Sequence, residues 1–312
     1  MAASFSSSVK EELAHVEPEC SHCEKATLAA LVRIEGTLFL SGTGTYRMEV
    51  ATDSASVARL VIRLLHGLYQ LKTDLTVRRS VLHKTPNYLI EVPRQPALAD
   101  ALQDLGILTA DGGLELGISP SLVRKQCDAA AYLRGAFLGS GFISNPRSDF
   151  HFEIMAETQE LAEGLQALMA LKGISARIMQ RRSSFMVYLK SGEAIMEFLA
   201  YVGAHQAALF MEEQRVVKSL RNDVNRLINA EMANQQKTSK AAGAQIAVIR
   251  EVLSAYGFEK LPPALQDFIR LRVQHPEASL KELGEMSDPP LSKSAINHRV
   301  RRLQQMAEEA SS

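Results

Sequence analysis

The 312-residue sequence contains no tryptophan, only three cysteines and no net charge. An odd number of cysteines argues against a disulfide framework. A net charge of zero means that nucleic acid would have to bind to a local basic patch. No apolar run approaches the roughly 20 residues that cross a bilayer, and Met1 to Ser8 lacks the basic and apolar regions of a secretory signal. These absences predict a cytoplasmic protein that does not bind membranes.

What the sequence does contain is a nine-residue pattern that occurs twice. Residues 28–36 and 133–141 are each rich in small side chains and end at a glycine. Small side chains let two helix backbones pack closely, and a glycine at a helix end favours a left-handed cap. The two stretches differ most at the residue before the glycine, which is Glu35 in the first and Ser140 in the second.

Both stretches resemble the LAGLIDADG motif of homing endonucleases. In that family each repeat is αββαββα, and the two motif helices pack together and bring two acids to the catalytic metal ions. The remaining sequence repeats in the same order, with Met48-Glu49-Val50 matching Phe152-Glu153-Ile154 and Gly106 matching Gly203. Residues 25–205 therefore predict an α+β fold, namely a pseudo-dimeric LAGLIDADG domain with two antiparallel four-stranded sheets.

Local signals place the first helices and hairpins. Ser7 or Ser8 is expected to cap a short helix before the first repeat, and the motif helix is expected from about Glu24 to Glu35. Hairpin turns are expected at residues 42–44 and 84–86, and a further helix is expected to begin at Ser54.

The two motif ends bear on catalysis. Metal-assisted hydrolysis of a phosphodiester needs carboxylates that hold divalent cations and activate water. Glu35 can serve, but Ser140 is neutral, and Gly139 and Gly141 have no side chain that could replace the acid. We therefore expect no nuclease activity, with Glu35 hydrogen-bonded inside the domain. The alternative is a metal-dependent LAGLIDADG endonuclease or a splicing maturase.

Arginines occur at matching positions of the two repeats. Arg78 and Arg79 correspond to Arg181 and Arg182 on equivalent predicted strands, and only one residue of each pair can face a groove because strands alternate their faces. These side chains are either solvated strand ends or a surface that contacts phosphates or a protein partner. Together with Lys237 they are possible secondary DNA contacts.

A short cysteine-containing segment precedes the first motif helix. Cys20, His22 and Cys23 have the spacing of half a zinc site, with His15 nearby in the sequence. A closed structural site needs four ligands, and the remaining cysteine, Cys127, is distant along the chain. We therefore expect free thiols at the start of a helix, no metal ion and no cofactor.

The last third of the chain predicts helices only. Residues 208–255 lack strand-like alternation and predict a helical connector, in which the asparagine-rich run 222–238 suits a polar network between packed helices or contact with nucleic acid. Ser279-Leu280-Lys281-Glu282 is a capping box, residues 288–291 form a stiff turn, and Ser292 can cap a last helix. This order is typical of a helix-turn-helix.

The last helix has an apolar stripe and an opposite polar face. Its stripe is Ile296, Val300, Leu303 and Ala307, whereas residues 292–302 hold four basic residues and no acid. Arg and Asn can reach base edges, while Lys and flanking Arg suit phosphates. The predicted DNA-binding residues are Ser279, Lys281, Ser292, Lys293, Ser294, Asn297, His298, Arg299, Arg301 and Arg302.

With the connector Asn225-Arg226-Leu227-Ile228-Asn229-Ala230-Glu231-Met232-Ala233-Asn234 and the ending at residues 288–299, nearly the whole chain resembles the WhiA family of Gram-positive bacteria. The resemblance implies a degenerate LAGLIDADG domain (1–207), a helical connector (208–255) and a helix-turn-helix domain (256–312). It implies a nucleoid-associated regulator of transcription, without nuclease activity, acting in cell division, chromosome segregation and, where it occurs, sporulation. The implied partners are double-stranded promoter DNA and a WhiB-type iron–sulfur regulator.

Overall fold

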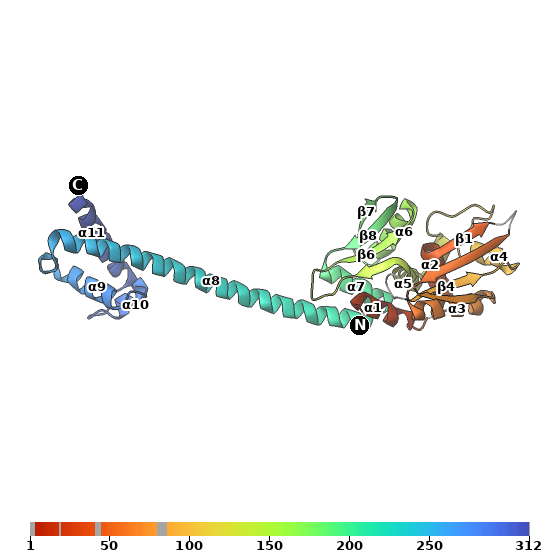
Figure 1. Cartoon of the computed structure of the whole chain (residues 1–312), viewed down its shortest axis with the longest axis horizontal. Coiled ribbons are helices and arrows are strands. Elements are labelled where there is room, and N and C mark those ends of the chain that lie inside the picture. The colour runs from red at the N-terminus through yellow and green to blue at the C-terminus, as the bar shows by residue number, and fades with distance from the viewer. Residues whose placement is uncertain (1–3, 19, 41–44, 80–85, 312) are drawn as a thin grey trace. The chain divides into compact units, whose positions relative to one another are not determined.

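The computed structural model describes residues 4–18, 20–40, 45–79 and 86–311 (Figure 1). The chain forms two compact units, Met1–Lys218 and Ser219–Ser312. The predicted division into residues 1–207, 208–255 and 256–312 stays a prediction. The predicted hairpin turn at residues 42–44 lies outside the described residues, and so do residues 84–85 of the turn predicted at 84–86, whose Pro86 begins a strand.

The first unit begins with α1 (Phe5–Ala14), which precedes the repeats. Its cap is Ser4, whose Oγ accepts a hydrogen bond from the backbone N–H of Ser7 at 3.1 Å. The prediction that Ser7 or Ser8 caps this helix is therefore wrong, because the chain already turns helical one turn earlier.

Two copies of the same element order follow. The first copy is α2 (Ser21–Glu35), β1 (Gly36–Leu40), β2 (Tyr46–Thr52), α3 (Ala55–Tyr69), β3 (Asp74–Arg79), β4 (Pro86–Val92) and α4 (Ala97–Asp104). A short helix, η1 (Pro120–Leu122), lies between the copies. The second copy is α5 (Gln126–Ser140), β5 (Gly141–Ile143), β6 (Phe152–Ala156), α6 (Gln159–Ala170), β7 (Arg177–Arg181), β8 (Ser184–Leu189) and α7 (Gly192–Val202). The predicted αββαββα repeats are confirmed.

Each repeat forms one antiparallel four-stranded sheet, in the orders β1-β2-β4-β3 and β5-β6-β8-β7. One face of each sheet is apolar because buried residues alternate along the central strands, as at Val50 and Ile90 or at Ile154 and Val187. The helices cover these faces, and one core runs through both repeats. The opposite, open faces carry charged residues such as Glu49, Arg78 and Glu153 together with apolar ones such as Phe142 and Met179.

The two motif helices α2 and α5 lie side by side at the centre of this unit (Figure 1). A Cβ added at Gly135 would come within 2.3 Å of the Thr27 carbonyl oxygen, and one at Gly139 within 2.9 Å of the Ile34 side chain. The predicted close approach through small residues is therefore confirmed.

The glycines that end the motif helices do not form left-handed caps. Gly36 has φ −83° and Gly141 has φ −68°, both in extended backbone that leads directly into a strand. A Cβ would instead collide with the carbonyl oxygen of Val32 at 2.2 Å or of Phe137 at 2.4 Å. The prediction of a left-handed end is wrong, because the close passage of the chain over the last helical turn is what requires glycine.

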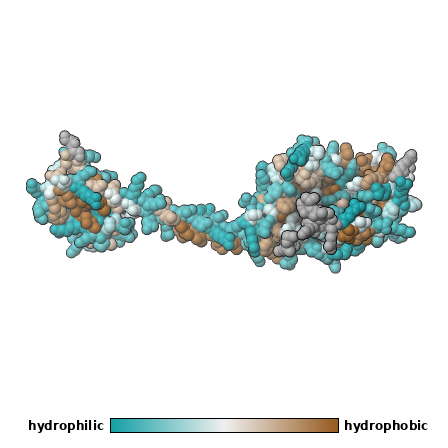
Figure 2. Space-filling view, viewed as in Figure 1, coloured by the Kyte–Doolittle hydropathy of each residue, from teal (hydrophilic) through white to brown (hydrophobic). Residues whose placement is uncertain are grey.

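A 52-residue helix, α8 (His205–Tyr256), runs from the first unit into the second. Its asparagine-rich run is exposed from residue 222 to 237, so among the described residues it forms no polar network with another packed helix. An apolar row is exposed along the same helix (Figure 2). No helix in the described part of the chain is both long and apolar enough to span a bilayer.

The second unit continues with η2 (Phe258–Lys260), α9 (Pro263–Gln274), α10 (Leu280–Glu285) and α11 (Lys293–Ser311). Its core joins the end of α8 to the three short helices, through Ile249 and Val252 of α8, Phe268 of α9, Leu283 of α10 and Ile296 of α11. The predicted all-α helix-turn-helix arrangement is confirmed.

Candidate nucleic-acid interface and the former nuclease site

The turn between α10 and α11 is held by backbone contacts and caps. Ser279 Oγ accepts from the Glu282 N–H at 3.3 Å, and the Ser279 N–H donates to the Glu282 carboxylate at 2.7 Å, which confirms the capping box. The Leu291 N–H donates to the Gly284 carbonyl at 2.8 Å. Ser292 Oγ then accepts from the Ala295 N–H at 3.2 Å and caps α11 as predicted.

The loop before α10 depends on Arg272, which the sequence analysis missed. This side chain of α9 is 1% exposed, and its guanidinium donates to the carbonyl oxygens of His275, Pro276 and Ala278, the last at 2.6 Å. Burial lowers the pKa of the Arg272 guanidinium below its usual value. A buried arginine has no distinct signal in a sequence, because its position within an apolar helix face resembles a chance polar interruption.

α11 presents the predicted stripe to the core and its basic residues away from it. Ile296, Val300, Leu303 and Ala307 are all buried. The side chains on the opposite face are exposed, namely those of Ser294, His298, Arg301, Arg302 and Gln305. Among the residues that the structure describes, none of the four basic side chains of residues 292–302 forms a salt bridge.

The remaining predicted DNA-binding residues lie at the edges of this face. Lys293 is exposed in the first turn of α11, whereas Asn297 and Arg299 flank the stripe and are half-buried. Lys281 is exposed on α10 and pairs with Glu285 at 3.6 Å. The hydroxyls of Ser279 and Ser292 are used as caps. The positive charge of this face therefore comes from α11, since Lys281 of α10 is paired with Glu285.

The predicted secondary contacts are dispersed. By register, Arg78 of β3 and Arg181 of β7 lie on the open faces of their sheets, on strands at the sheet edges. The side chain of Arg79 lies outside what the structure describes. Arg182 lies in the β7–β8 turn with φ +57°, so its predicted place on a strand is wrong. Lys237 is exposed on α8.

Acidic residues balance the arginines of these open faces. Arg47 pairs with Glu49 at 2.8 Å, and His151 contacts Glu153 at 2.9 Å. The register places Asp74 and Glu91 on the same open face as Arg78. The open faces therefore lack the excess of positive charge that phosphate binding favours.

The ends of the motif helices confirm the loss of one acid. Ser140 Oγ donates to the Met155 carbonyl at 2.7 Å and accepts from the Met155 N–H at 3.1 Å. Lys10 of α1 enters the same region, where its Nζ donates to the Gly139 carbonyl at 2.8 Å. The Lys10 ammonium and the Ser140 hydroxyl thus lie where a LAGLIDADG endonuclease would need its second carboxylate.

Glu35 is not hydrogen-bonded among the described residues, contrary to the prediction. Burial raises the pKa of its carboxyl group above 4.5; the Lys10 ammonium lowers this pKa, and the charges of Asp53 and Glu157 raise it again. Burial likewise lowers the pKa of Lys10, against the effect of Asp53 and Glu35. Within the described part of the chain, these acids do not converge closely enough to form a shared metal site.

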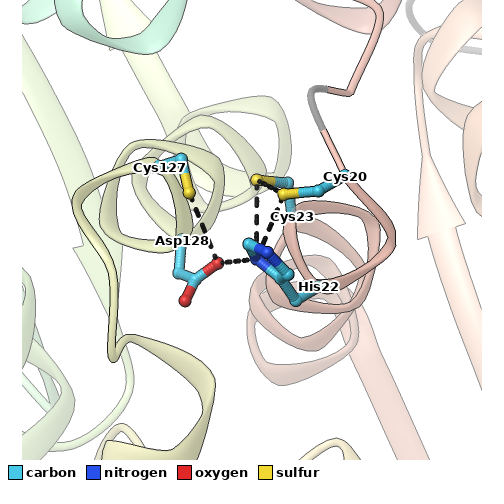
Figure 3. A group of neighbouring side chains, drawn as sticks. All are labelled: Cys20, His22, Cys23, Cys127 and Asp128. Carbon is cyan, nitrogen blue, oxygen red and sulfur yellow. Dashed lines mark hydrogen bonds and ion pairs between the residues drawn. The ribbon is translucent and has the colours of Figure 1, made fainter.

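The cysteines differ most from expectation, because Cys127 lies beside Cys20, His22 and Cys23 (Figure 3). No disulfide joins the three cysteines, and Cys127 is distant only along the chain. Burial, together with the neighbouring thiols of Cys20 and Cys127, raises the pKa of Cys23. The repeat could have revealed this neighbour, since Cys127 follows Cys23 by the same 104 residues that separate Phe152 from Met48.

Two LAGLIDADG-like repeats that lack the second acid, followed by a helix-turn-helix unit, define the class of this protein. Comparison with known families agrees at each part of the chain. Residues 21–108 match the WhiA N-terminal LAGLIDADG-like domain, residues 129–221 the WhiA LAGLIDADG-like domain, and residues 224–307 the WhiA C-terminal HTH domain. The chain belongs to the WhiA family.

Relatives match over nearly the full length. The chain is 44% identical to the probable cell division protein WhiA of Heliobacterium modesticaldum, covering 98% of this chain and 96% of that protein. It is 42% identical to the protein of the same name from Symbiobacterium thermophilum, with 98% of both covered. The crystal structure of full-length DUF199/WhiA from Thermotoga maritima shares the fold, with a TM-score of 0.61 and 24% identity over 98% of this chain and 99% of that one.

Proposed function

We propose that the protein is a sequence-specific DNA-binding regulator of transcription that acts on genes of cell division and chromosome segregation, and of sporulation where it occurs. The observation that carries the proposal is the basic face of α11 after a rigid turn, whose four basic side chains form no salt bridge with any residue that the structure describes. Such a helix can enter the major groove, where Arg301 and Arg302 contact base edges while Lys293 and Arg299 contact phosphates. The names of the relatives supply the link to cell division.

The test is a binding titration with promoter fragments recovered by mapping the sites that the protein occupies in the genome. Arg301→Ala combined with Arg302→Ala should weaken binding about tenfold or more, because each direct base contact contributes about 1–3 kcal/mol. The matched control removes the same charge from exposed positions of α8, with Lys240→Ala and Arg250→Ala, and should change affinity much less. Equal affinity of the α11 variant and the native chain would refute the assignment of the recognition helix.

The sheets of the first unit are proposed to contribute little to DNA affinity, since their open faces have balanced charge. Arg78→Ala with Arg181→Ala, made in the full chain, should leave the salt dependence of binding unchanged. If both arginines contact phosphates, the slope of log K against log salt concentration would instead fall by about 1.8 in magnitude.

We further propose that the protein cleaves no DNA, because Ser140 and Lys10 occupy the region of the second acid. Supercoiled plasmid should stay intact with Mg²⁺ or Mn²⁺. Cleavage that Glu35→Ala abolishes would establish the endonuclease or maturase alternative instead. A WhiB-type iron–sulfur protein stays a predicted partner that rests on the family resemblance alone.

A further inference from the structure

The first turns of the two motif helices bring together five side chains that can bind metal ions. Cys20 is the N-cap residue of α2, and His22 and Cys23 lie in its first turn. Cys127 and Asp128 lie in the first turn of α5. One ligand atom from each residue lies within 4.8 Å of all the others, and Figure 3 shows the side chains pointing toward a common centre. No other group of this kind exists in the described ranges.

We propose that Cys20, His22, Cys23 and Cys127 form a structural zinc site that joins the two repeats. The separations between the ligand atoms are close to those of a zinc site, so small movements of the side chains would allow a cation to bind. Cys20 Sγ lies 2.9 Å from Cys23 Sγ and 3.1 Å from His22 Nδ1, and Cys23 Sγ lies 4.0 Å from His22 Nδ1. A tetrahedral zinc ion with bonds of about 2.3 Å to sulfur and about 2.0 Å to nitrogen separates such atoms by roughly 3.5–3.8 Å.

The donor atoms select the metal. Three thiolates favour soft or borderline cations such as Zn²⁺, whereas Mg²⁺ and Ca²⁺ require oxygen ligands. Three cysteines and one histidine are an established ligand set of structural zinc sites, and a closed set leaves no position for substrate. The proposed role of the zinc site is therefore structural, namely to stabilise the contact between the two repeats.

His22 is assigned as the fourth ligand, and Asp128 as its neighbour. One carboxylate oxygen of Asp128 already accepts a hydrogen bond from the backbone N–H of Lys125 at 3.0 Å in a cap of α5. The other oxygen contacts His22 Nδ1 and has to move off this atom when a metal ion binds there. Metal bound at Nδ1 leaves the ring proton on Nε2, so the exposed Lys125 ammonium, 3.4 Å from Nε2, has to turn away.

The position at two helix N-termini suits the charge of the site. One zinc ion with three thiolates carries a net negative charge, which the positive ends of the α2 and α5 dipoles stabilise. α2 has 15 residues and is about 22 Å long, so the cluster lies at the opposite end of the helix pair from Glu35 and Ser140. The zinc site would hold the N-termini of α2 and α5 together and would not contact Glu35 or Ser140.

The experiment uses the untagged full chain, purified with its thiols reduced. Elemental analysis should find one zinc ion per chain, and cobalt added to the zinc-free protein should give thiolate-to-cobalt charge-transfer absorption. Cys127→Ser should lose both signals, although this residue is 104 positions from Cys23. His15→Ala is the matched control for His22→Ala, because His15 is exposed and its described contacts are with the backbone carbonyl and the carboxylate of Glu11. The His15→Ala variant should bind zinc normally.

A second comparison tests whether His22 is the fourth ligand and whether the zinc ion stabilises the fold. His22→Ala should abolish tight binding, whereas Asp128→Asn, which removes a nearby negative charge but no ligand, should weaken it much less. Chelation should lower the Tm of the native chain and leave the Tm of Cys127→Ser unchanged. Should the cysteine variant fail to fold, cobalt titration of the native chain decides alone.

Three results would overturn the proposal. The first is a reduced native chain that binds neither zinc nor cobalt. The second is a Cys20–Cys23 disulfide in the isolated protein with Cys127 free, which would make the pair a redox element. The third is undiminished zinc binding by Cys127→Ser, which would remove the link between the repeats.

Discussion

Ser140 bonds Met155 twice, because its hydroxyl donates to the Met155 carbonyl at 2.7 Å and accepts from the Met155 N–H at 3.1 Å. The last residue of the second motif helix is therefore hydrogen-bonded to the backbone of β6. The equivalent residue of the first helix, Glu35, has instead a half-buried carboxylate next to Lys10. Positions related by the repeat have thus acquired different chemistry.

Restoring an acid at this position should not restore a nuclease. Ser140→Asp replaces a donor by a carboxylate that faces the Met155 carbonyl, and the free energy of unfolding should fall by about 1–3 kcal/mol. Urea denaturation measures this change, and Ser140→Thr, which keeps the hydroxyl, is the control. Mg²⁺-dependent plasmid cleavage by Ser140→Asp would show that Lys10 does not block the site.

The pKa of Glu35 should make stability depend on pH. Since burial raises this pKa above 4.5, the folded protein binds the proton more tightly than the unfolded chain does. The contribution is therefore fully present below pH 4.5 and is lost as the pH rises through the folded-state pKa. Urea unfolding at a series of pH values should show a smaller decline for Glu35→Gln than for the native chain. Parallel curves for the two proteins would contradict the raised pKa.

The contact between the motif helices should not tolerate a methyl group. In Gly135→Ala the added Cβ meets the Thr27 carbonyl oxygen at 2.3 Å, so we expect the first unit to lose about 1–3 kcal/mol of stability. Gly67→Ala is the matched control, because Gly67 is at an exposed position of α3 and a Cβ added there meets nothing within 4 Å. This control should gain up to about 1 kcal/mol from helix propensity. Thermal unfolding compares the two, and equal Tm shifts would refute the close packing.

The turn of the helix-turn-helix should be equally sensitive. A Cβ on Gly284 would lie 2.2 Å from the Leu291 carbonyl oxygen, so Gly284→Ala should displace the start of α11. We expect about a tenfold or greater loss of DNA affinity, because base contacts worth about 1–3 kcal/mol each depend on this placement. Gly243→Ala on α8, where a Cβ meets nothing within 4 Å, should bind DNA normally. Normal binding by Gly284→Ala would show that α11 does not depend on this turn.

Much of the architecture could be predicted because its signals are local or repeated. The alternation of β2 and β6, the Ser54 cap of α3, the Ser279–Glu282 capping box and the stripe of α11 each depend on a few neighbouring residues. The helix ends were predicted less well. Gly36 and Gly141 are required by close passage of the chain rather than by a left-handed φ, and a sequence does not distinguish these two reasons for glycine.

The sequence by itself determined the two-repeat plan, the replacement of the second acid by Ser140 and the basic face of the last helix, since periodicity and residue identity suffice for these. Only the tertiary structure decided which distant groups meet. It places Lys10 beside Glu35, buries Arg272 under the loop before α10, and brings Cys127 to Cys20, His22 and Cys23. The physical reason is that side-by-side packing of α2 and α5 fixes these neighbours. That packing depends on contacts between residues about a hundred positions apart, such as Thr27 and Gly135, which no local pattern records.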